Sequence, residues 1–265
     1  MRRVQSGAMS MLALDCSTDL LSVAVRHGDR LWALDEVTGS AASQRILPVV
    51  MKLLDDAGLA PPVVSAFAPP ATVPADSTLA IALGAGPGSF TGLRIACGVV
   101  QGLALAWGCP VVQVSSFEAV AAKARALHGD RAARVWVALD ARMGEVYLAA
   151  LEAHGETWTM LGAPEALPPA AALARIQAAG DGFFACGSGF SLYPALAATG
   201  ASTFTGVDPA LAVDARVMID LAQRALAAGQ AIDPAQVAPL YVRDKVALTI
   251  AERRERSARA AGQSA

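Results

Sequence analysis

Two stretches of the chain, MLALD at residues 11–15 and VWVALD at residues 135–140, decide its fold. Each is a short apolar run that ends in Ala-Leu-Asp, and each is followed by a polar turn and further apolar runs. Short apolar runs separated by polar turns predict antiparallel strands joined by hairpins. The same pattern therefore starts twice, and an internal repeat of this kind dictates the architecture.

Other landmarks repeat in the same order. Leu83-Gly84-Ala85-Gly86 and Cys186-Gly187-Ser188-Gly189 each follow an apolar run with a Gly-x-Gly turn. One such match arises easily by chance in any α/β protein, but a meander, a terminal Asp and a glycine turn occurring twice favour duplication. Strands are predicted at 11–15, 20–26, 31–37, 79–84, 110–115, 135–140, 145–152, 157–161 and 182–186, and helices at 43–59, 93–107, 116–127, 169–180 and 213–229.

This order of elements predicts the fold class. A three-strand meander, a helix, a parallel strand and a glycine turn, present twice, describe an α/β protein with a duplicated actin-like/Hsp70-like (ribonuclease H-like) ATPase fold in two lobes. In that fold the turn after the first strand of each half faces the cleft between the lobes. We assign 11–115 to the first lobe, 116–209 to the second lobe, 210–246 to a closing helix and extended segment, and 1–10 and 252–265 to flexible ends.

Composition excludes several classes of function. The formal net charge is −2, so the chain lacks the excess of basic residues that a protein usually needs to bind nucleic acid without a partner. The 4 cysteines are scattered without a Cys-x-x-Cys pair, which argues against a disulfide framework or a zinc knuckle and suits the reducing cytoplasm. Glycines, glutamines and Pro110 interrupt the apolar stretch at 95–114, so a buried helix and strand are favoured over a membrane span.

Polar residues at the strand ends are candidates for a phosphate or nucleotide cleft. Asp15 is followed by two hydroxyl residues, and together they favour a phosphate or a hydrated metal ion; the alternative is a turn in which these side chains bond their own backbone. Asp140 starts a turn with Arg142 and Glu145, for which the alternative is a hairpin with a surface ion pair. The candidate cleft residues are Asp15, Ser17, Thr18, Gly86, Gly88, Ser89, Thr91 and Asp140.

The run GPGSFTG at 86–92 is the strongest local motif. Its glycines permit a close approach of backbone to a ligand, and Ser89 or Thr91 can cap the next helix. The run is neither a Walker A loop nor a nucleophile elbow, because the required lysine and Gly-x-Ser-x-Gly are missing. The helix after it carries small residues at Gly98, Gly102 and Ala106, which can serve either close packing on its own sheet or contact with a partner.

The three histidines do not indicate catalysis. His27, His128 and His154 each lie in a predicted loop, and no two are spaced to bind a metal from one helix face. Nothing in the sequence brings one of them to a serine. No metal site is therefore predicted.

Several long motifs in one order resemble the TsaB (YeaZ) family, whose members are partners in making the threonylcarbamoyladenosine modification of tRNA. The resemblance covers about residues 11–246. Its motifs in this chain are LALDCSTDLLSVAV, SQRILPVV, GPGSFTGLRIACGVVQGLALA, VALDARMGEVY and PLYVRDKVA.

The resemblance implies a non-catalytic scaffold or activator. It implies binding to TsaD, the paralogue that would transfer threonylcarbamoyl to A37 of tRNAs reading ANN codons, with the ATPase TsaE joining the assembly. Contact with tRNA would occur only through this complex, and the chain would pair with itself through the same helices when TsaD is absent. No cofactor is required, although weak binding of ATP or ADP with Mg²⁺ stays open. The implied partner-contact residues are Gln44, Arg45, Val49, Arg94, Gly98, Gln101, Gly102 and Ala106.

The chain departs from the family pattern in two places. Ala42 stands where family members often have a histidine before Ser-Gln-Arg-Ile-Leu-Pro, and the loop at 61–77 is longer than usual. Two other functions remain as alternatives. An ATP-using kinase or carbamoyl-type transferase would need Asp15 and Asp140 as its carboxylate pair around Mg²⁺. A peptidase has neither a metal pair nor a nucleophile elbow to support it.

Overall fold

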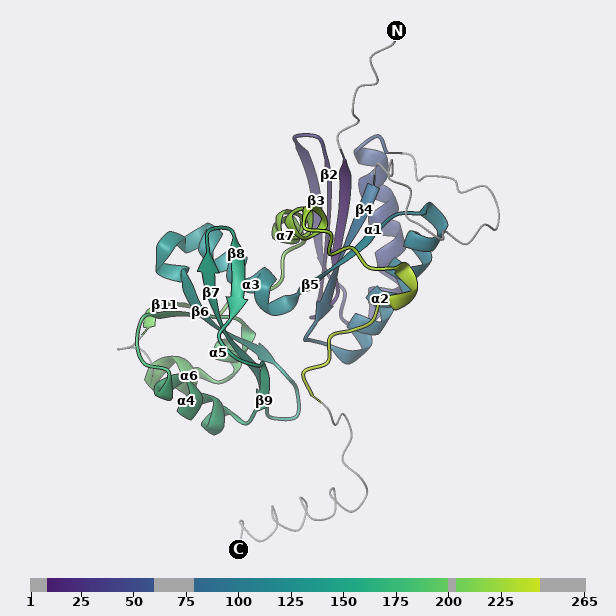
Figure 1. Cartoon of the computed structure of the whole chain (residues 1–265). Coiled ribbons are helices and arrows are strands. Elements are labelled where there is room, and N and C mark those ends of the chain that lie inside the picture. Colours follow the sequence, from purple (N-terminus) through teal and green to yellow (C-terminus); the bar gives the residue numbers. More distant parts are fainter. Residues whose placement is uncertain (1–8, 60–78, 200–203, 244–265) are drawn as a thin grey trace, which may run out of the picture.

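The computed structural model describes residues 9–59, 79–199 and 204–243. These residues form two lobes, each built on one mixed sheet with helices packed against it (Figure 1). The predicted 61–77 loop, almost all of the predicted flexible ends and residues 244–246 of the closing segment lie outside the described residues.

The first lobe holds a five-stranded sheet in the order β3-β2-β1-β4-β5. β1 pairs antiparallel with β2 and parallel with β4, so the meander lies on one side of β1 and the parallel strands on the other. Two helices cover the outer face of this sheet. The elements are β1 (Ser10–Asp15), β2 (Leu20–His27), β3 (Arg30–Val37), α1 (Ala42–Asp56), β4 (Leu79–Gly86), α2 (Phe90–Trp107) and β5 (Val111–Ser115).

The second lobe repeats this topology. Its sheet has the order β11-β10-β6-β7-β8, with β6 antiparallel to β7 and parallel to β10, and β9 is added beside β7. The predicted duplication and two-lobed fold class are confirmed. The elements are β6 (Arg134–Asp140), β7 (Val146–His154), β8 (Thr157–Met160), β9 (Glu165–Leu167), α4 (Pro169–Ala178), β10 (Phe183–Cys186), α5 (Ser188–Leu192), α6 (Pro194–Thr199) and β11 (Phe204–Asp208).

Alternation along β1 divides the first lobe into two cores. Leu12 and Leu14 belong to the cluster under α1 and α2, whereas Met11 and Ala13 belong to a cluster shared with the second lobe. That shared cluster also contains α3 (Ser116–His128) and α7 (Ala215–Ala227), which lie between the two sheets (Figure 1).

Helices α3 and α7 join the two lobes. α3 follows the last strand of the first sheet, and its Phe117 and Val120 share a core with Val135 and Val137 of the second sheet. α7 follows the last strand of the second sheet and packs across β1, β2, β4 and β5 of the first. α3 thus lies between the two sheets and contacts strands of both, whereas α7, which follows the second lobe in the sequence, completes the first lobe.

Polar contacts fix the start of α7 on the first sheet. The Asp214 carboxylate accepts from the Arg216 backbone N–H at 2.9 Å and lies 3.1 Å from Lys123 Nζ of α3. Ser22 Oγ accepts from Ala215 N–H at 3.0 Å and donates to Asp35 Oδ1 at 2.6 Å. This network joins α7 to β2, β3 and α3, and it leaves these buried polar groups with partners.

Some predictions at the element level need correction. The strand predicted at 79–84 continues to Gly86, and α2 starts at Phe90 rather than Leu93, so only Pro87–Ser89 lie between them. The predicted turn at 187–190 is the start of α5. β9, α6 and β11 were not predicted, because the short or interrupted apolar runs there carry no clear period.

The alignment of the two halves also shifts by two residues. With Asp15 equated to Asp140, Leu12 pairs with Ile81 in the first sheet, and the equivalent Val137 pairs with Cys186 in the second. Cys186 therefore corresponds to Ile81, not to Leu83. The second-lobe glycine turn begins two residues earlier because β10 is shorter than β4.

Candidate functional site

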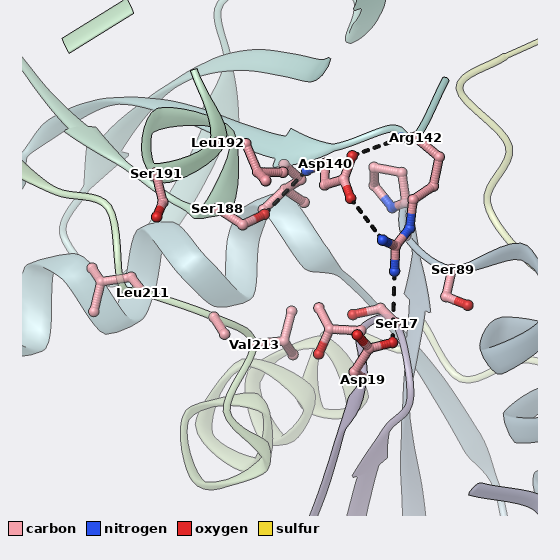
Figure 2. Close-up of a pocket in the computed structure, with 15 residues that line it drawn as sticks. Ser17, Asp19, Ser89, Asp140, Arg142, Ser188, Ser191, Leu192, Leu211 and Val213 are labelled. Atoms are coloured by element: carbon pink, nitrogen blue, oxygen red, sulfur yellow. Dashed lines mark hydrogen bonds and ion pairs between the residues drawn. The ribbon is translucent and has the colours of Figure 1, made fainter. Parts of the chain in front are cut away.

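A cleft of about 310 Å³ lies between the lobes. The turn after β1 contributes Ser17 and Thr18, and the turn after β4 contributes Gly88 and Ser89. The second lobe contributes carboxylate, guanidinium and hydroxyl groups that face them (Figure 2). The remaining lining residues are Asp19, Pro87, Leu139, Asp140, Arg142, Ser188, Ser191, Leu192, Leu211, Ala212 and Val213.

The two first-lobe turns contact each other directly. Ser89 N–H donates to the Ser17 carbonyl at 2.6 Å, and a Cβ on Gly88 would lie 2.3 Å from the same oxygen. Glycine is therefore required at position 88 for the turns to come this close. Ser89 Oγ accepts from Gly92 N–H at 3.3 Å and caps α2, so of the two predicted caps, Ser89 and Thr91, the structure has Ser89.

Asp15 faces the interior and not the cleft. Its Oδ1 accepts from the backbone N–H and the hydroxyl of Ser17, at 2.9 and 2.7 Å, and its Oδ2 is buried without a hydrogen-bond partner. A Cβ on Gly84 would lie 2.0 Å from Oδ2, so the carboxylate occupies the space that this glycine leaves. Burial raises the pKa of Asp15 to about 6, against the two hydrogen bonds from Ser17 that lower it.

Asp140 lies in the cleft and is engaged by its own turn. Its Oδ1 accepts from Arg142 N–H at 2.7 Å, and its Oδ2 lies 3.2 Å from Arg142 Nη1. The other end of the Arg142 guanidinium is 3.6 Å from Asp19 Oδ1 of the first lobe (Figure 2). Asp140 N–H donates to Ser188 Oγ at 3.1 Å. Arg142 thus extends across the cleft between carboxylates of the two lobes.

The structure brings five of the eight predicted cleft residues together. Ser17, Thr18, Gly88, Ser89 and Asp140 line the cleft. Asp15, Gly86 and Thr91 do not line it: Asp15 is buried, Gly86 packs beneath Leu93, and Thr91 lies on the exposed first turn of α2.

Sequence reasoning missed Arg142, Asp19, Ser188 and Ser191 as cleft residues. The turn that contains Arg142 was among the predicted candidates. However, nothing in the sequence indicates the left-handed backbone of Arg142 (φ 59°), with which its side chain extends across the cleft. Ser188 stood in a noticed glycine turn. Asp19 and Ser191 are brought there only by the pairing of the two lobes.

The small-residue stripe of α2 is open on the outer face of the first lobe. Gly98, Gly102 and Ala106 are exposed, and a Cβ on either glycine would meet no atom within 4 Å. Leu47 and Met51 of the neighbouring α1 are also exposed, at 45% and 44%. These residues form an apolar surface with little side-chain bulk, here called the α1–α2 face.

Other predicted contact residues are placed differently. Gln44 is exposed on α1, and Arg45 is exposed but paired with Glu36, 2.7 Å from Nε to Oε1. Val49 is a correction: it is 2% exposed and packs in the core under α1, so its side chain cannot meet a partner.

Arg94 and Gln101 already bind the C-terminal part of the chain. The Arg94 guanidinium lies 3.6 Å from the Phe90 ring centroid and donates to Tyr241 Oη at 3.1 Å. Gln101 donates its side-chain amide to the Val237 carbonyl at 3.1 Å. Both residues would have to exchange these contacts to meet a partner.

Two general features bear on the type of site. Within the described ranges, no group of three or more His, Cys, Asp or Glu side chains is placed to hold a metal ion. In the same part of the chain α2 is long and apolar enough to span a membrane by length and composition alone. Leu93, Ala96 and Val100 of α2 are buried against its own lobe, as expected for a core helix.

The duplicated sheets, the helices α3 and α7 between them and the hydroxyl-lined cleft between the lobes define a two-lobed protein of the actin-like ATPase fold class. Residues 36–249 match the family model described as TsaD: tRNA N6-adenosine threonylcarbamoyltransferase. The chain belongs to the TsaB (YeaZ) family, among the proteins that this model matches.

Three relatives illustrate this membership. The Haemophilus influenzae protein named tRNA threonylcarbamoyladenosine biosynthesis protein TsaB is 32% identical, over 90% of this chain and 95% of its own length. The Escherichia coli protein of the same name is 31% identical, over 90% and 96%. The solved structure of YeaZ from Pseudomonas aeruginosa is 34% identical and covers 88% of this chain and 99% of its own, with a TM-score of 0.69.

Proposed function

We propose that this protein acts in the synthesis of threonylcarbamoyladenosine on tRNA, as a non-catalytic scaffold or activator of the transferase complex. Its relatives carry biosynthesis of this nucleoside in their names. In this proposal a TsaD-like paralogue transfers threonylcarbamoyl to A37 of tRNAs that read ANN codons. The present chain binds that paralogue and works in the cytoplasm, with a TsaE-like ATPase as a further partner.

The open α1–α2 face carries the proposal. Helices can approach most closely where both contribute small residues, and Gly98 and Gly102 have free space above them. Leu47, Met51 and Leu105 add exposed apolar area beside the glycines. An apolar surface of this kind, with small residues at its centre, suits the docking of a partner's helix pair. The same face serves self-pairing when the paralogue is absent.

The geometry of the cleft supports an accessory role. A phosphoryl-transfer enzyme of this fold would present carboxylates to Mg²⁺ from both lobes. Here Asp15 is turned into the first lobe, and Asp140 is engaged by Arg142. The guanidinium of Arg142 extends between Asp140 and Asp19, so the carboxylate that the second lobe would offer to a metal ion is already paired.

No cofactor is required in this proposal. The cleft keeps hydroxyl groups and the start of α2, so weak binding of ATP or ADP with Mg²⁺ belongs to the proposal as a residual property of the fold. Titration calorimetry with Mg-ATP and Mg-ADP at millimolar ligand measures this binding. If no heat of binding is measured, nucleotide binding is refuted, and the proposed scaffold role is unaffected.

Reconstitution tests the proposed function. A TsaD-like protein, a TsaE-like ATPase, tRNA and threonylcarbamoyl-adenylate are mixed with and without the present chain, and modified A37 is counted by nucleoside mass spectrometry. We expect no modification by this chain alone and a strong rise in rate when it joins its partners. An unchanged rate when the chain is omitted would refute the proposal. tRNA binding measured in parallel should require the partners, since the chain has no basic excess.

A further inference from the structure

The segment after α7 forms a strap, defined here as residues 230–243, that runs from the first lobe to the second (Figure 1). It begins on β5, where Ile232 N–H donates to the Val111 carbonyl at 2.8 Å. It then follows α2, where Val237 accepts from Gln101. The strap is therefore attached along the first lobe before it reaches the second.

The strap stays on the first lobe until Tyr241. Leu240 N–H donates to the Ala85 carbonyl at 2.7 Å, next to the turn that lines the cleft. The Tyr241 hydroxyl accepts from Arg94, and its ring lies 6.1 Å from that of Phe90. These contacts set where the following residues leave the first lobe.

Arg243 attaches the strap to the turn between β6 and β7. Its guanidinium is paired with Glu145, donates to the Ala141 carbonyl at 3.4 Å, and lies 3.7 Å from Met143 Sδ. The Arg243 side chain is only 18% exposed, less than most of the ion-paired arginines of this protein. A partly desolvated pair with a second acceptor is stronger than an isolated surface pair.

The turn that Arg243 holds is strained. Arg142 and Met143 are consecutive non-glycine residues with left-handed backbones, at φ 59° and 56°. Such conformations persist where surrounding contacts over-determine them, and they cluster at functional and switching segments. The same turn carries the guanidinium that reaches Asp19 across the cleft.

We propose that the strap sets the opening of the cleft between the lobes. Arg243 acts as a positioning residue: by holding Ala141 and Glu145 it keeps the turn in its left-handed form, which aims Arg142 at Asp19. Release of Arg243 lets the turn relax, withdraws Arg142 from the first lobe and opens the cleft. The device depends on contacts within this chain and not on the proposed role in tRNA modification.

The opening can be measured by electron spin resonance distances in the full-length chain. Spin labels are attached at Asp55→Cys on α1 and Gln177→Cys on α4, two exposed positions on opposite lobes. Burial protects the native cysteines from the label and raises the pKa of Cys16, Cys97 and Cys109 to about 12, 11 and 12.

Arg243→Ala is compared with Arg175→Ala, which removes an arginine ion pair within the second lobe, to Glu165. We expect Arg243→Ala to add a population at longer distance, and the control to leave the distribution unchanged. Identical distributions for Arg243→Ala and the unsubstituted chain would overturn the proposal. Glu145→Gln keeps the shape of the side chain and tests the same contact if Arg243→Ala does not fold.

A double variant separates positioning from a general loss of structure. If Arg243 acts through Arg142, then Arg142→Ala opens the cleft to the same extent, and Arg142→Ala with Arg243→Ala opens it no further. Additive opening by the two substitutions, or no opening with Arg142→Ala, would show that the strap does not act through this turn and would overturn the proposal.

Discussion

At the scale of single residues, Asp15 illustrates how a strand end can look like a ligand site and serve the interior. The strand ends beside the cleft, but the missing side chain of Gly84 leaves a space in the interior, and the Asp15 carboxylate occupies that space. Ser17 then supplies both donors to Oδ1. The result is a buried acid with one unpartnered oxygen, which is costly when ionised.

We predict that Asp15→Asn stabilises the protein at neutral pH. The pKa of Asp15 is about 6 in the folded chain and 3.8 ordinarily, so the folded state holds a proton that the unfolded state has lost. The stability of the unsubstituted chain must therefore fall as pH rises from about 4 to 6. The shift corresponds to about 2–3 kcal/mol. Urea unfolding of both proteins at pH 4.5, 6 and 7.5 measures it.

The informative quantity is the difference in unfolding free energy between the two proteins. We expect that difference to move in favour of the Asp15→Asn variant as pH rises and to level off above pH 7. Other titrating groups change both proteins alike and cancel. A difference that stays constant from pH 4.5 to 7.5 would show that Asp15 is ionised throughout.

Sequence predicted residue roles well where the local backbone decides them. Ser89 caps α2 because a hydroxyl at that position meets the first free N–H groups. Val49 was predicted to face a partner and Asp15 to face the cleft, but both side chains are buried, and the two errors have one reason. Which face of a helix or strand end is buried depends on the neighbouring element, and Gly84 lies far from Asp15 in the sequence.

At the scale of elements, α2 has one face buried in the core and one face exposed. Leu93, Ala96 and Val100 build the core, whereas Gly98, Gly102 and Ala106 stay exposed. A helix whose exposed face is rich in glycine gives up intrinsic stability, about 0.5–1 kcal/mol per glycine relative to alanine. That cost is understandable if the face is covered when the protein works.

We predict that Gly102→Leu leaves the monomer folded and abolishes binding to the TsaD-like partner. A side chain at this position meets no neighbour within the chain, so thermal stability should stay the same or rise slightly. Its bulk would hold a docking helix away from α2. Calorimetric titration with the partner measures the affinity, and we expect a loss of at least 100-fold.

Ala178→Leu is the matched control, since it adds a similar side chain to an exposed position of α4 on the other lobe. It should bind the partner as tightly as the unsubstituted chain. Unchanged affinity for Gly102→Leu would move the interface to another face of the protein.

Shortening the side chain of Ile219 in α7 should lower the stability of the protein. Ile219 is fully buried between the sheets, so Ile219→Ala loses its burial and leaves a cavity worth about 2–5 kcal/mol. Leu127→Ala is the control, because Leu127 is 62% exposed and should change stability little. If the urea midpoint of Ile219→Ala fell no further than that of Leu127→Ala, the result would mean that α7 is not part of the core.

Elements with a clear hydrophobic period were predicted close to their observed bounds, as in α1, α3 and α7. The missed elements are short: β9 has three residues and β11 five. β11 alternates partly buried and exposed positions, and it exists because Phe183–Cys186 offers a free parallel edge. Such strands are decided by their neighbours and not by their own composition.

At the scale of the whole molecule, the repeat of Ala-Leu-Asp correctly indicated two lobes of one topology. It could not indicate that α3 contacts both sheets or that α7 packs on the first sheet. A pattern along the chain shows which face of a helix is apolar, but not which of two similar sheets that face meets. The small inner residues Ala13, Ala24, Ala80 and Ala82 are what allow α7 to lie close to the first sheet.

We predict that a fragment ending at Ser115 does not fold on its own. It lacks α7, so the inner face of its sheet, with Met11, Val112 and Val114, would meet water. We expect dye binding to exposed apolar surface and no cooperative thermal transition, whereas the full chain melts cooperatively. A sharp transition in the fragment would show that the first lobe is independent.

The packing of α7 on the first sheet also has a consequence for how the protein is made in a cell. The first sheet leaves the ribosome about 100 residues before Ala215, where α7 begins. At ordinary rates of translation this interval lasts about 5–20 s. During that time the inner face of the nascent sheet can be covered by α3 over β4 and β5, but the cover that α7 gives to β1 and β2 is missing. Chaperones that hold apolar nascent segments should therefore occupy this protein early, and release it only after α7 has emerged.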